Sequence, residues 1–428
     1  MDPSSNNLAT PSDKNEQVSS SQNAGSSAIE SNTINTADID NVNGSKEQNA
    51  GEQAGSIIQS ASLSTLTNTS QNASSDQIRR LGEKVEKAIL PADLKQNLIE
   101  RVQRLALLRA SSGHLSSNYI IEYESTLSYI NWVVNLPWNN SSRDLLDLVS
   151  AKTILDKNHY GLPNVKNRIL EYLAAIILSE KNNPSKDNEL QIIRAPILCL
   201  VGLVGTGKTT LASSIAEALG RKFERIPFGG MGDARALRGQ SRAFPDAEPG
   251  YIVKKLTHSQ TKNSVILLDE LDRVSQEARA DIMGVLVELL DPEQNRAFTD
   301  HYIDYPFDLS QVLFISTANN TTNISTAVLD RLEIIQMPSY TNEEKTVIAK
   351  NYLFPKIRDQ VGLLTNQIAI DDSVWQGIIH PLGFDSGIRS LERTIEGVCR
   401  KVARLIVEEK GQSFRITDQN LKGFLPSW

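Results

Sequence analysis

The chain has 428 residues, of which 39% are hydrophobic, so it is long enough and apolar enough to fill the cores of more than one domain. Its formal net charge of −7 at pH 7 disfavours a protein that binds nucleic acid over its whole surface, although a local basic patch is compatible with it. No apolar run approaches the roughly 20 residues of a membrane-spanning helix, so no membrane partner is expected.

The first residues and the cysteines indicate the compartment. The N-terminus has neither a charged region followed by an apolar core nor an arginine-rich pattern, which disfavours secretory and mitochondrial targeting. Cys199 and Cys399 have no zinc spacing and form no disulfide framework, so both are expected to be buried free thiols. A cytoplasmic location fits these features best.

Residues 1–76 are predicted to form a disordered tail. They are rich in Ser, Asn, Thr, Ala, Gln and Gly and contain no aromatic residue. Such a composition cannot bury enough apolar surface to offset the entropy lost on ordering.

Residues 77–146 are predicted to form an arm made of helices. Apolar residues recur at helical spacing after Asp76, which has the side chain of an N-cap, and again after Pro91. A third helical pattern ends at Leu136, because the following proline stops a helix. The polar side of the first helices is basic. A solvated surface is the simpler interpretation, and a weak nucleic-acid or partner surface is the alternative.

Residues 147–338 are predicted to form an α/β domain around a phosphate-binding loop. A strand-like apolar run, Ile197–Val201, and a helical pattern flank residues 202–209, which match G-x-x-x-x-G-K-T. Glycines let backbone N–H groups approach phosphate oxygens, and a helix N-terminus favours an anion. Lys208 is expected at the β- and γ-phosphates of ATP, and the Thr209 hydroxyl at Mg²⁺. The predicted nucleotide-binding residues of this loop are Gly202, Gly205, Thr206, Gly207, Lys208, Thr209 and Thr210.

Two acidic residues follow a second apolar run. Residues 265–268 are typical of a strand covered on both faces, and Asp269 and Glu270 come directly after them. Sheets of α/β proteins bind ligands at the carboxyl ends of their strands. Asp269 is therefore predicted to help hold Mg²⁺, and Glu270 to act as the general base on the attacking water.

Further strands extend the sheet, and a helical region follows it. Residues 312–319 form a strand pattern that ends in Asn319, which is predicted to orient the water beside the γ-phosphate. Strands that alternate with helices predict one parallel sheet with right-handed crossovers. Residues 339–428 are predicted to form a small, mostly helical lid. Its expected elements are helices at 343–354 and 375–379, a long helix from 388 and a short strand at 414–416.

Together, the phosphate-binding loop, the Asp-Glu strand, the polar strand end and the helical lid resemble an AAA+ ATPase of the P-loop NTPase class. Longer strings resemble the ATPase module of the Lon family of ATP-dependent proteases, from about residue 78 to the end of the chain. These strings are Leu136-Pro137-Trp138, His159-Tyr160-Gly161-Leu162, and residues 289–295, 298–302, 329–333 and 387–393.

The resemblance implies roles for individual residues. Asn319 matches sensor 1, and Arg389 matches sensor 2, which carries the state of the nucleotide to the lid. Arg331 matches the arginine finger, which reaches the γ-phosphate bound by a neighbouring subunit. Tyr160 lies in the adenine-side motif, and Phe244 matches the aromatic residue of the first pore loop. The resemblance also implies a homohexameric ring that acts on unfolded or damaged proteins.

The chain departs from the family pattern at two places. Leu203 and Val204 stand where the family usually has two prolines, away from the phosphate chemistry. Pro245 and Asp246 follow Phe244 where the family prefers an aliphatic residue and a glycine, so the grip on substrate is expected to differ.

The sequence leaves more than one function open. An ATP-driven unfoldase or translocase is the first hypothesis, with a protease domain supplied in trans as one option. No Pro-x-Ser-x-Gly peptidase segment follows the lid, so this chain is not expected to cleave peptide bonds by itself. The alternatives are a chaperone-like remodeller without a protease and a nucleotide-dependent scaffold. The complete set of hydrolytic residues argues against the scaffold.

Overall fold

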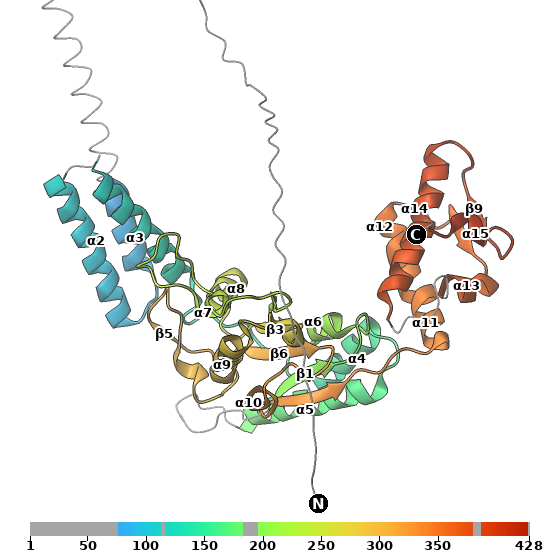
Figure 1. Ribbon diagram of the computed structural model, residues 1–428, viewed down its shortest axis with the longest axis horizontal. Coiled ribbons are helices and arrows are strands. Elements are labelled where there is room, and N and C mark those ends of the chain that lie inside the picture. Colours follow the sequence, from blue (N-terminus) through green and yellow to red (C-terminus); the bar gives the residue numbers. More distant parts are fainter. Residues whose placement is uncertain (1–75, 113–115, 183–195, 380–386, 427–428) are drawn as a thin grey trace, which may run out of the picture. The chain divides into compact units, whose positions relative to one another are not determined.

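The computed structural model describes residues 76–112, 116–182, 196–379 and 387–426 of the chain (Figure 1). The tail predicted for residues 1–76 lies outside these ranges, apart from Asp76. The described residues form one large parallel sheet with its connecting helices, preceded and followed by further helices. The predicted fold class, a P-loop α/β domain with helical segments on either side in the sequence, is confirmed.

Helices precede the sheet, as predicted for the arm. They lie at residues 76–87, in α2 (Ala92–Ser112) and in α3 (Ser117–Asn135). α3 contacts the α/β domain through two tyrosines. The Tyr129 hydroxyl donates to the carbonyl of Ile303 at 3.0 Å, and the Tyr302 hydroxyl donates to Ser128 Oγ at 3.1 Å.

The large sheet has the strand order β2-β3-β6-β1-β7, and every pairing in it is parallel. Its strands are β1 (Ile197–Val201), β2 (Phe223–Pro227), β3 (Val265–Asp269), β6 (Leu313–Ala318) and β7 (Leu332–Gln336). β3 and β6 are buried along their whole length, including the polar residues Asp269, Ser316 and Thr317, as expected of strands that are covered on both faces. Parallel pairing brings the residues after β1, β3 and β6 to one edge of the sheet.

Helices cover both faces of this sheet. Neighbouring residues of β1 point to opposite sides, so Leu198 and Leu200 join one hydrophobic cluster, while Cys199 and Val201 join another. The helices and remaining strands of this part are α4 (Leu148–Asn158), α5 (Pro163–Asn182), α6 (Lys208–Leu219), α7 (Arg235–Arg238), α8 (Tyr251–Ser259), α9 (Arg279–Leu289), β4 (Phe298–Thr299), β5 (Pro306–Phe307) and α10 (Thr326–Leu329). α4, α5 and α6 contribute to the first cluster, and α8 and α9 to the second.

The chain after the sheet forms the mostly helical part predicted as a lid. The helix expected at 343–354 does not end there, because helical backbone continues to Val361 through a π-helical segment at 349–353. A capping box at Thr341 and Glu344 starts it. The elements are α11 (Asn342–Ile348), α12 (Phe354–Val361), β8 (Ile368–Ile370), α13 (Trp375–Ile379), α14 (Arg389–Val407), β9 (Phe414–Ile416) and α15 (Leu421–Phe424).

Two further expectations concern cysteines and membranes. Cys199 lies in β1 and Cys399 in α14, and both are buried free thiols, as predicted. Burial raises the pKa of both thiols. No helix in the described ranges has the length and apolar character that crossing a membrane would require.

Candidate functional site

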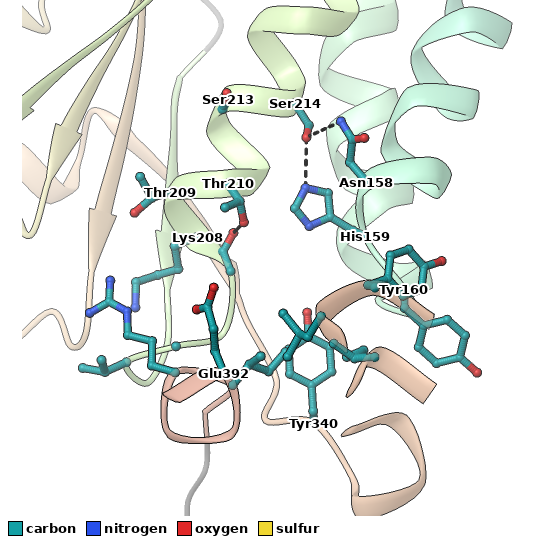
Figure 2. A pocket seen from close by; sticks show the side chains of 18 of the residues that line it. Asn158, His159, Tyr160, Lys208, Thr209, Thr210, Ser213, Ser214, Tyr340 and Glu392 are labelled. Carbon is teal, nitrogen blue, oxygen red and sulfur yellow. Dashed lines mark hydrogen bonds between the residues drawn. The ribbon is translucent and has the colours of Figure 1, made fainter. Parts of the chain in front are cut away.

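A pocket of about 570 Å³ lies where the phosphate-binding loop meets the carboxyl ends of β3 and β6. Its volume is within the usual range of small-molecule sites, roughly 300–1,000 Å³. Residues from the end of α4, from α6 and from α11, α12 and α14 of the lid complete its wall (Figure 2). Of the predicted site residues, the pocket brings together Tyr160, Gly205, Gly207, Lys208, Thr209, Thr210, Asp269, Glu270, Asn319 and Arg389.

The phosphate-binding loop has the backbone that an anion site needs. Gly205 and Gly207 have φ angles of +84° and +88°, in the left-handed region that glycine adopts without a steric penalty. Gly207 caps the N-terminus of α6, so the first N–H groups of that helix are directed at the pocket. The loop therefore offers backbone donors and a helix N-terminus to a phosphate.

Lys208 links the loop to β6. Its Nζ donates to the carbonyls of Gly202 and Leu203, at 2.7 and 3.0 Å, and to Asn319 Oδ1 at 3.1 Å. Burial lowers the pKa of Lys208, and Asp272 and Asp269 oppose this shift. The ammonium group is thus held between the loop and the end of β6, where a nucleotide phosphate would meet it.

Two of the predicted loop residues, Gly202 and Thr206, lie outside the pocket wall. A Cβ atom on Gly202 would lie 2.7 Å from the carbonyl oxygen of Met337, so the site needs glycine there. The Thr206 side chain is buried, and its hydroxyl donates to the carbonyl of Leu203 at 2.9 Å. Both residues shape the loop without lining the pocket.

Asp269 and Thr209 present oxygen atoms that fit a divalent metal ion. Asp269 Oδ1 lies 3.4 Å from Thr209 Oγ1 and also accepts a hydrogen bond from Thr317 Oγ1. A hydroxyl and a carboxylate oxygen side by side are the hard ligands that Mg²⁺ prefers, and nucleotide sites usually supply only one or two such protein ligands. These residues therefore fit a metal ion that is shared with a bound nucleotide.

Glu270 is held in a strained conformation at the end of β3. Its φ angle is +63°, which few residues other than glycine adopt, and its backbone N–H donates to Thr317 Oγ1 at 2.9 Å. Its carboxylate lies 3.5 Å from Arg273, and a Cβ atom on Gly229 would come within 2.9 Å of it. Glu270 lines the pocket from this left-handed backbone position.

Asn319 is fixed by an acid that the sequence did not single out. Its backbone N–H donates to Asp272 Oδ1 at 3.0 Å, and its amide nitrogen lies 3.4 Å from Asp272 Oδ2. Because the amide oxygen accepts from Lys208, the orientation of the side chain is defined on both sides. Asp272 is itself buried.

The wall beside Tyr160 is built around His159 (Figure 2). His159 Nε2 lies 3.0 Å from Ser214 Oγ, which also accepts a hydrogen bond from Asn158 Nδ2 at 3.0 Å. The backbone carbonyl of His159 accepts from the Lys166 ammonium at 2.6 Å. These contacts tie the end of α4 to α6 and hold Tyr160 at the rim of the pocket.

Lowering the pH from 7 to 5 is expected to destabilise the fold through His159. Burial, aided by the Lys166 charge, lowers the pKa of His159 from 6.5 to about 4. The unfolded chain therefore binds a proton that the folded chain refuses, and the free energy of unfolding falls as the pH drops below 6.5, by about 2 kcal/mol at pH 5. Urea unfolding of the wild type and of His159→Gln at both pH values measures this. Equal pH dependence of the two proteins would contradict a neutral, buried His159.

The lid contacts the phosphate-binding loop directly. The backbone N–H of Ile388 donates to the carbonyl of Gly205 at 3.1 Å, and a Cβ atom on Gly387 would lie 2.3 Å from the carbonyl oxygen of Val204. Arg389 and Glu392 on α14 then line the pocket. The first residues of α14 are thus in backbone contact with the loop that would hold the phosphates.

Two further predicted site residues, Arg331 and Phe244, lie away from the pocket wall. Arg331, just before β7, donates to Asp291 Oδ2 at 3.0 Å and to the carbonyl of Ala327 at 2.8 Å. Phe244 lies in the loop between α7 and α8 with its side chain 58% exposed. In the same loop Asp246 has a φ angle of +56°, a left-handed backbone at the position where the family favours glycine.

Known families match both the α/β domain and the lid. Residues 198–340 match the model of the ATPase family associated with various cellular activities (AAA), and residues 359–414 match that of the Lon protease AAA+ ATPase lid domain. The chain thus contains an AAA ATPase domain followed by a Lon-type lid domain. An AAA ATPase domain implies that the pocket takes a nucleotide together with a divalent metal ion.

Several relatives are Lon proteases of bacteria. The chain is 42% identical over 350 residues to a Lon protease of Lawsonia intracellularis. It is 40% identical over 349 residues to Lon protease 2 of Herpetosiphon aurantiacus, and 41% identical over 349 residues to Lon protease 1 of Bacillus subtilis. Each alignment covers 82% of this chain and between 40% and 43% of the relative. The chain thus spans about two fifths of the length of these Lon proteases.

Some functional residues of this pocket were not predicted from the sequence. Asp272 and Thr317 orient Asn319, Asp269 and Glu270, and His159 and Tyr340 line the pocket. His159 begins a string that resembles the family, and this string was the sequence feature that could have identified it. The role of Thr317 becomes evident only once the pairing of β3 with β6 is known.

Proposed function

We propose that the chain is an ATP-hydrolysing motor that unfolds and translocates proteins. The observation that carries the proposal is the meeting of the phosphate-binding loop, the Asp269-Glu270 pair, Asn319 and the lid residue Arg389 around one pocket. A nucleotide-binding scaffold would need the loop, but it would need neither a base at Glu270 nor a polar residue that orients water.

The proposed hydrolysis uses the residues of the pocket in distinct roles. Backbone N–H groups of the loop and Lys208 would hold the phosphates of ATP, with Thr209 and Asp269 as protein ligands of Mg²⁺. Mg²⁺, when bound, neutralises negative charge on the phosphates. Glu270 would accept a proton from the attacking water, which Asn319 would hold in line. Arg389, at the start of α14, would contact the phosphate and thereby couple the state of the nucleotide to the lid.

We propose that the active form is a homohexameric ring. Family resemblance suggests the ring, and the position of Arg331 outside its own pocket supports it, because this guanidinium group would complete the pocket of a neighbouring subunit. A head-to-tail contact that closes on itself gives such a ring.

The proposed substrates are unfolded or damaged proteins, gripped by Phe244. A large aromatic side chain that is 58% exposed on a loop is available to contact a polypeptide. The proposed partner is a protease domain acting in trans, which would cleave the protein that this motor unfolds. The cytoplasmic location remains a prediction that two free cysteines support, and nucleic-acid binding remains a weak alternative.

Replacing Phe244 by alanine is expected to stop protein unfolding while it leaves at least about half of the ATPase activity, because the side chain lies outside the nucleotide pocket. Unfolding of a tagged fluorescent protein and phosphate release measure the two activities on the same sample. Val407→Ala removes a side chain that is 82% exposed on the lid, and serves as the matched control. Normal unfolding by Phe244→Ala would contradict the assigned grip.

A further inference from the structure

Asp269, the proposed metal ligand, already has a cation as its partner. Arg225 on β2 donates to Asp269 Oδ2 from Nε at 2.7 Å and approaches the same oxygen with Nη2 at 2.6 Å. Only 5% of the Asp269 side chain is exposed, whereas 51% of the Arg225 side chain is. The carboxylate is thus buried and depends on its partner, while the guanidinium group remains half in solvent.

The two oxygen atoms of Asp269 serve different partners. Oδ1 faces Thr209 and Thr317, on the side of the pocket, and Oδ2 faces Arg225. Arg225 itself does not line the pocket, so it meets the carboxylate from behind. A metal ion at Oδ1 would therefore share a single negative charge with a guanidinium group that is already in place.

Lys208 does not take over this role in the described structure. Its Nζ donates to two loop carbonyls and to Asn319 Oδ1, so these hydrogen bonds go to the loop and to the end of β6 rather than to Asp269. Arg225 is the cation in ion-pair contact with Asp269 among the described residues.

We propose that Arg225 is a positioning residue that sets the balance between metal-bound and metal-free nucleotide in this pocket. This rests on the proposed nucleotide site. The charge of Arg225 offsets that of Asp269, which weakens the attraction of the carboxylate for Mg²⁺ and reduces its repulsion of nucleotide phosphates when no metal is bound. Arg225 thereby acts as a partial, permanent substitute for the charge of the metal.

Removing this charge should move two affinities in opposite directions. In the full chain with Arg225→Gln, the Mg²⁺ concentration that half-saturates tight ADP binding should fall about 3- to 10-fold. The dissociation constant of ADP in EDTA should rise by a similar factor, since the half-exposed pair is partly screened. A fluorescent ADP analogue measures both without any turnover.

A second variant separates the effect of the positive charge from the effect of the two-nitrogen contact that the guanidinium group makes with Asp269. Arg225→Lys keeps the charge and should stay within about twofold of the wild type in both measurements. Arg225→Met repeats the neutral change without hydrogen-bonding groups. Lys255→Gln, which removes a cation paired with the neighbouring β2 residue Glu224 at 3.2 Å, controls for net charge.

Each outcome decides the inference. Affinities with and without Mg²⁺ that shift together, or Mg²⁺ binding that weakens in the neutral variants, would show that Arg225 only orients Asp269 and would overturn the proposal. The same follows if Arg225→Lys behaves as Arg225→Gln does. If the wild-type chain binds no ADP at all, the proposed function fails together with this inference. If it binds ADP but the neutral variants keep the wild-type ratio, the inference fails alone.

Discussion

Replacing Glu270 by glutamine is expected to lower ATP turnover at least about 100-fold while ATP remains bound. The two side chains have the same shape, so the strained backbone at residue 270 and the hydrogen bond from its N–H to Thr317 should persist. Glutamine cannot accept a proton from water at neutral pH. A positioned general base usually contributes between roughly 10² and 10⁴ to a rate.

The measurement combines phosphate release with retention of radiolabelled ATP after gel filtration. Glu277→Gln makes the same chemical change at an exposed acid seven positions along the chain and should turn over ATP as the wild type does. Turnover by Glu270→Gln within about threefold of the wild type would remove Glu270 from the role of base. Loss of binding would instead make it part of the phosphate site.

The features of the pocket that were predictable from the sequence are those whose residues are consecutive in the chain. The loop from Gly202 to Thr209 and the acids after β3 each combine a strand with its terminal chemistry in one short stretch. Since parallel strands bring their carboxyl ends to a common edge, the placement of Lys208, Asp269 and Asn319 at one edge of the sheet was predictable. The fold class and the Lon-type resemblance were predictable for the same reason.

Contacts between distant segments were not predictable in this way. Thr317 reaches Asp269 because β3 pairs with β6 in one particular register, which a single sequence does not specify. Arg225 reaches Asp269 because β2 borders β3. Such pairs need the strand order, and apolar patterns predict strands without ordering them.

Some elements were missed because their signals are short or were not used. The hairpin β4–β5 has two residues in each strand, too few for an alternating pattern, and β8 has three. α9 did carry a signal, since Ile282, Leu286 and Leu289 recur at helical spacing and are buried. The end of the helix after Thr341 was placed too early, because the π-helical segment at 349–353 continues the helix where its apolar spacing shifts.

Replacing Arg331 by alanine is expected to lower ATP hydrolysis about 1,000-fold in assembled rings and to leave nucleotide binding within a few-fold of the wild type. A cation that completes the pocket of a neighbour stabilises charge that develops on the transferring phosphoryl group, and such residues contribute roughly 10³ to 10⁵ to the rate. Arg331 lies outside the wall of its own pocket, so ADP binding by a subunit should not depend on it.

The variant must be separated from loss of the local structure. Arg331 pairs with Asp291 at 3.0 Å, so Asp291→Asn breaks the same ion pair and keeps the guanidinium group. If the ion pair were what mattered, both variants would lose activity. Retained hydrolysis by Asp291→Asn together with loss in Arg331→Ala assigns the effect to the guanidinium group itself.

Mixing two inactive variants tests whether the residue acts between subunits. Arg331→Ala supplies an intact Glu270, and Glu270→Gln supplies an intact Arg331. In mixed rings, the head-to-tail contact joins both intact groups at about a quarter of the interfaces, so activity should return to a measurable fraction of the wild type. Mixed rings that stay inactive, or a dilute monomer of Arg331→Ala that loses activity as severely as the ring, would mean that Arg331 does not act on a neighbour.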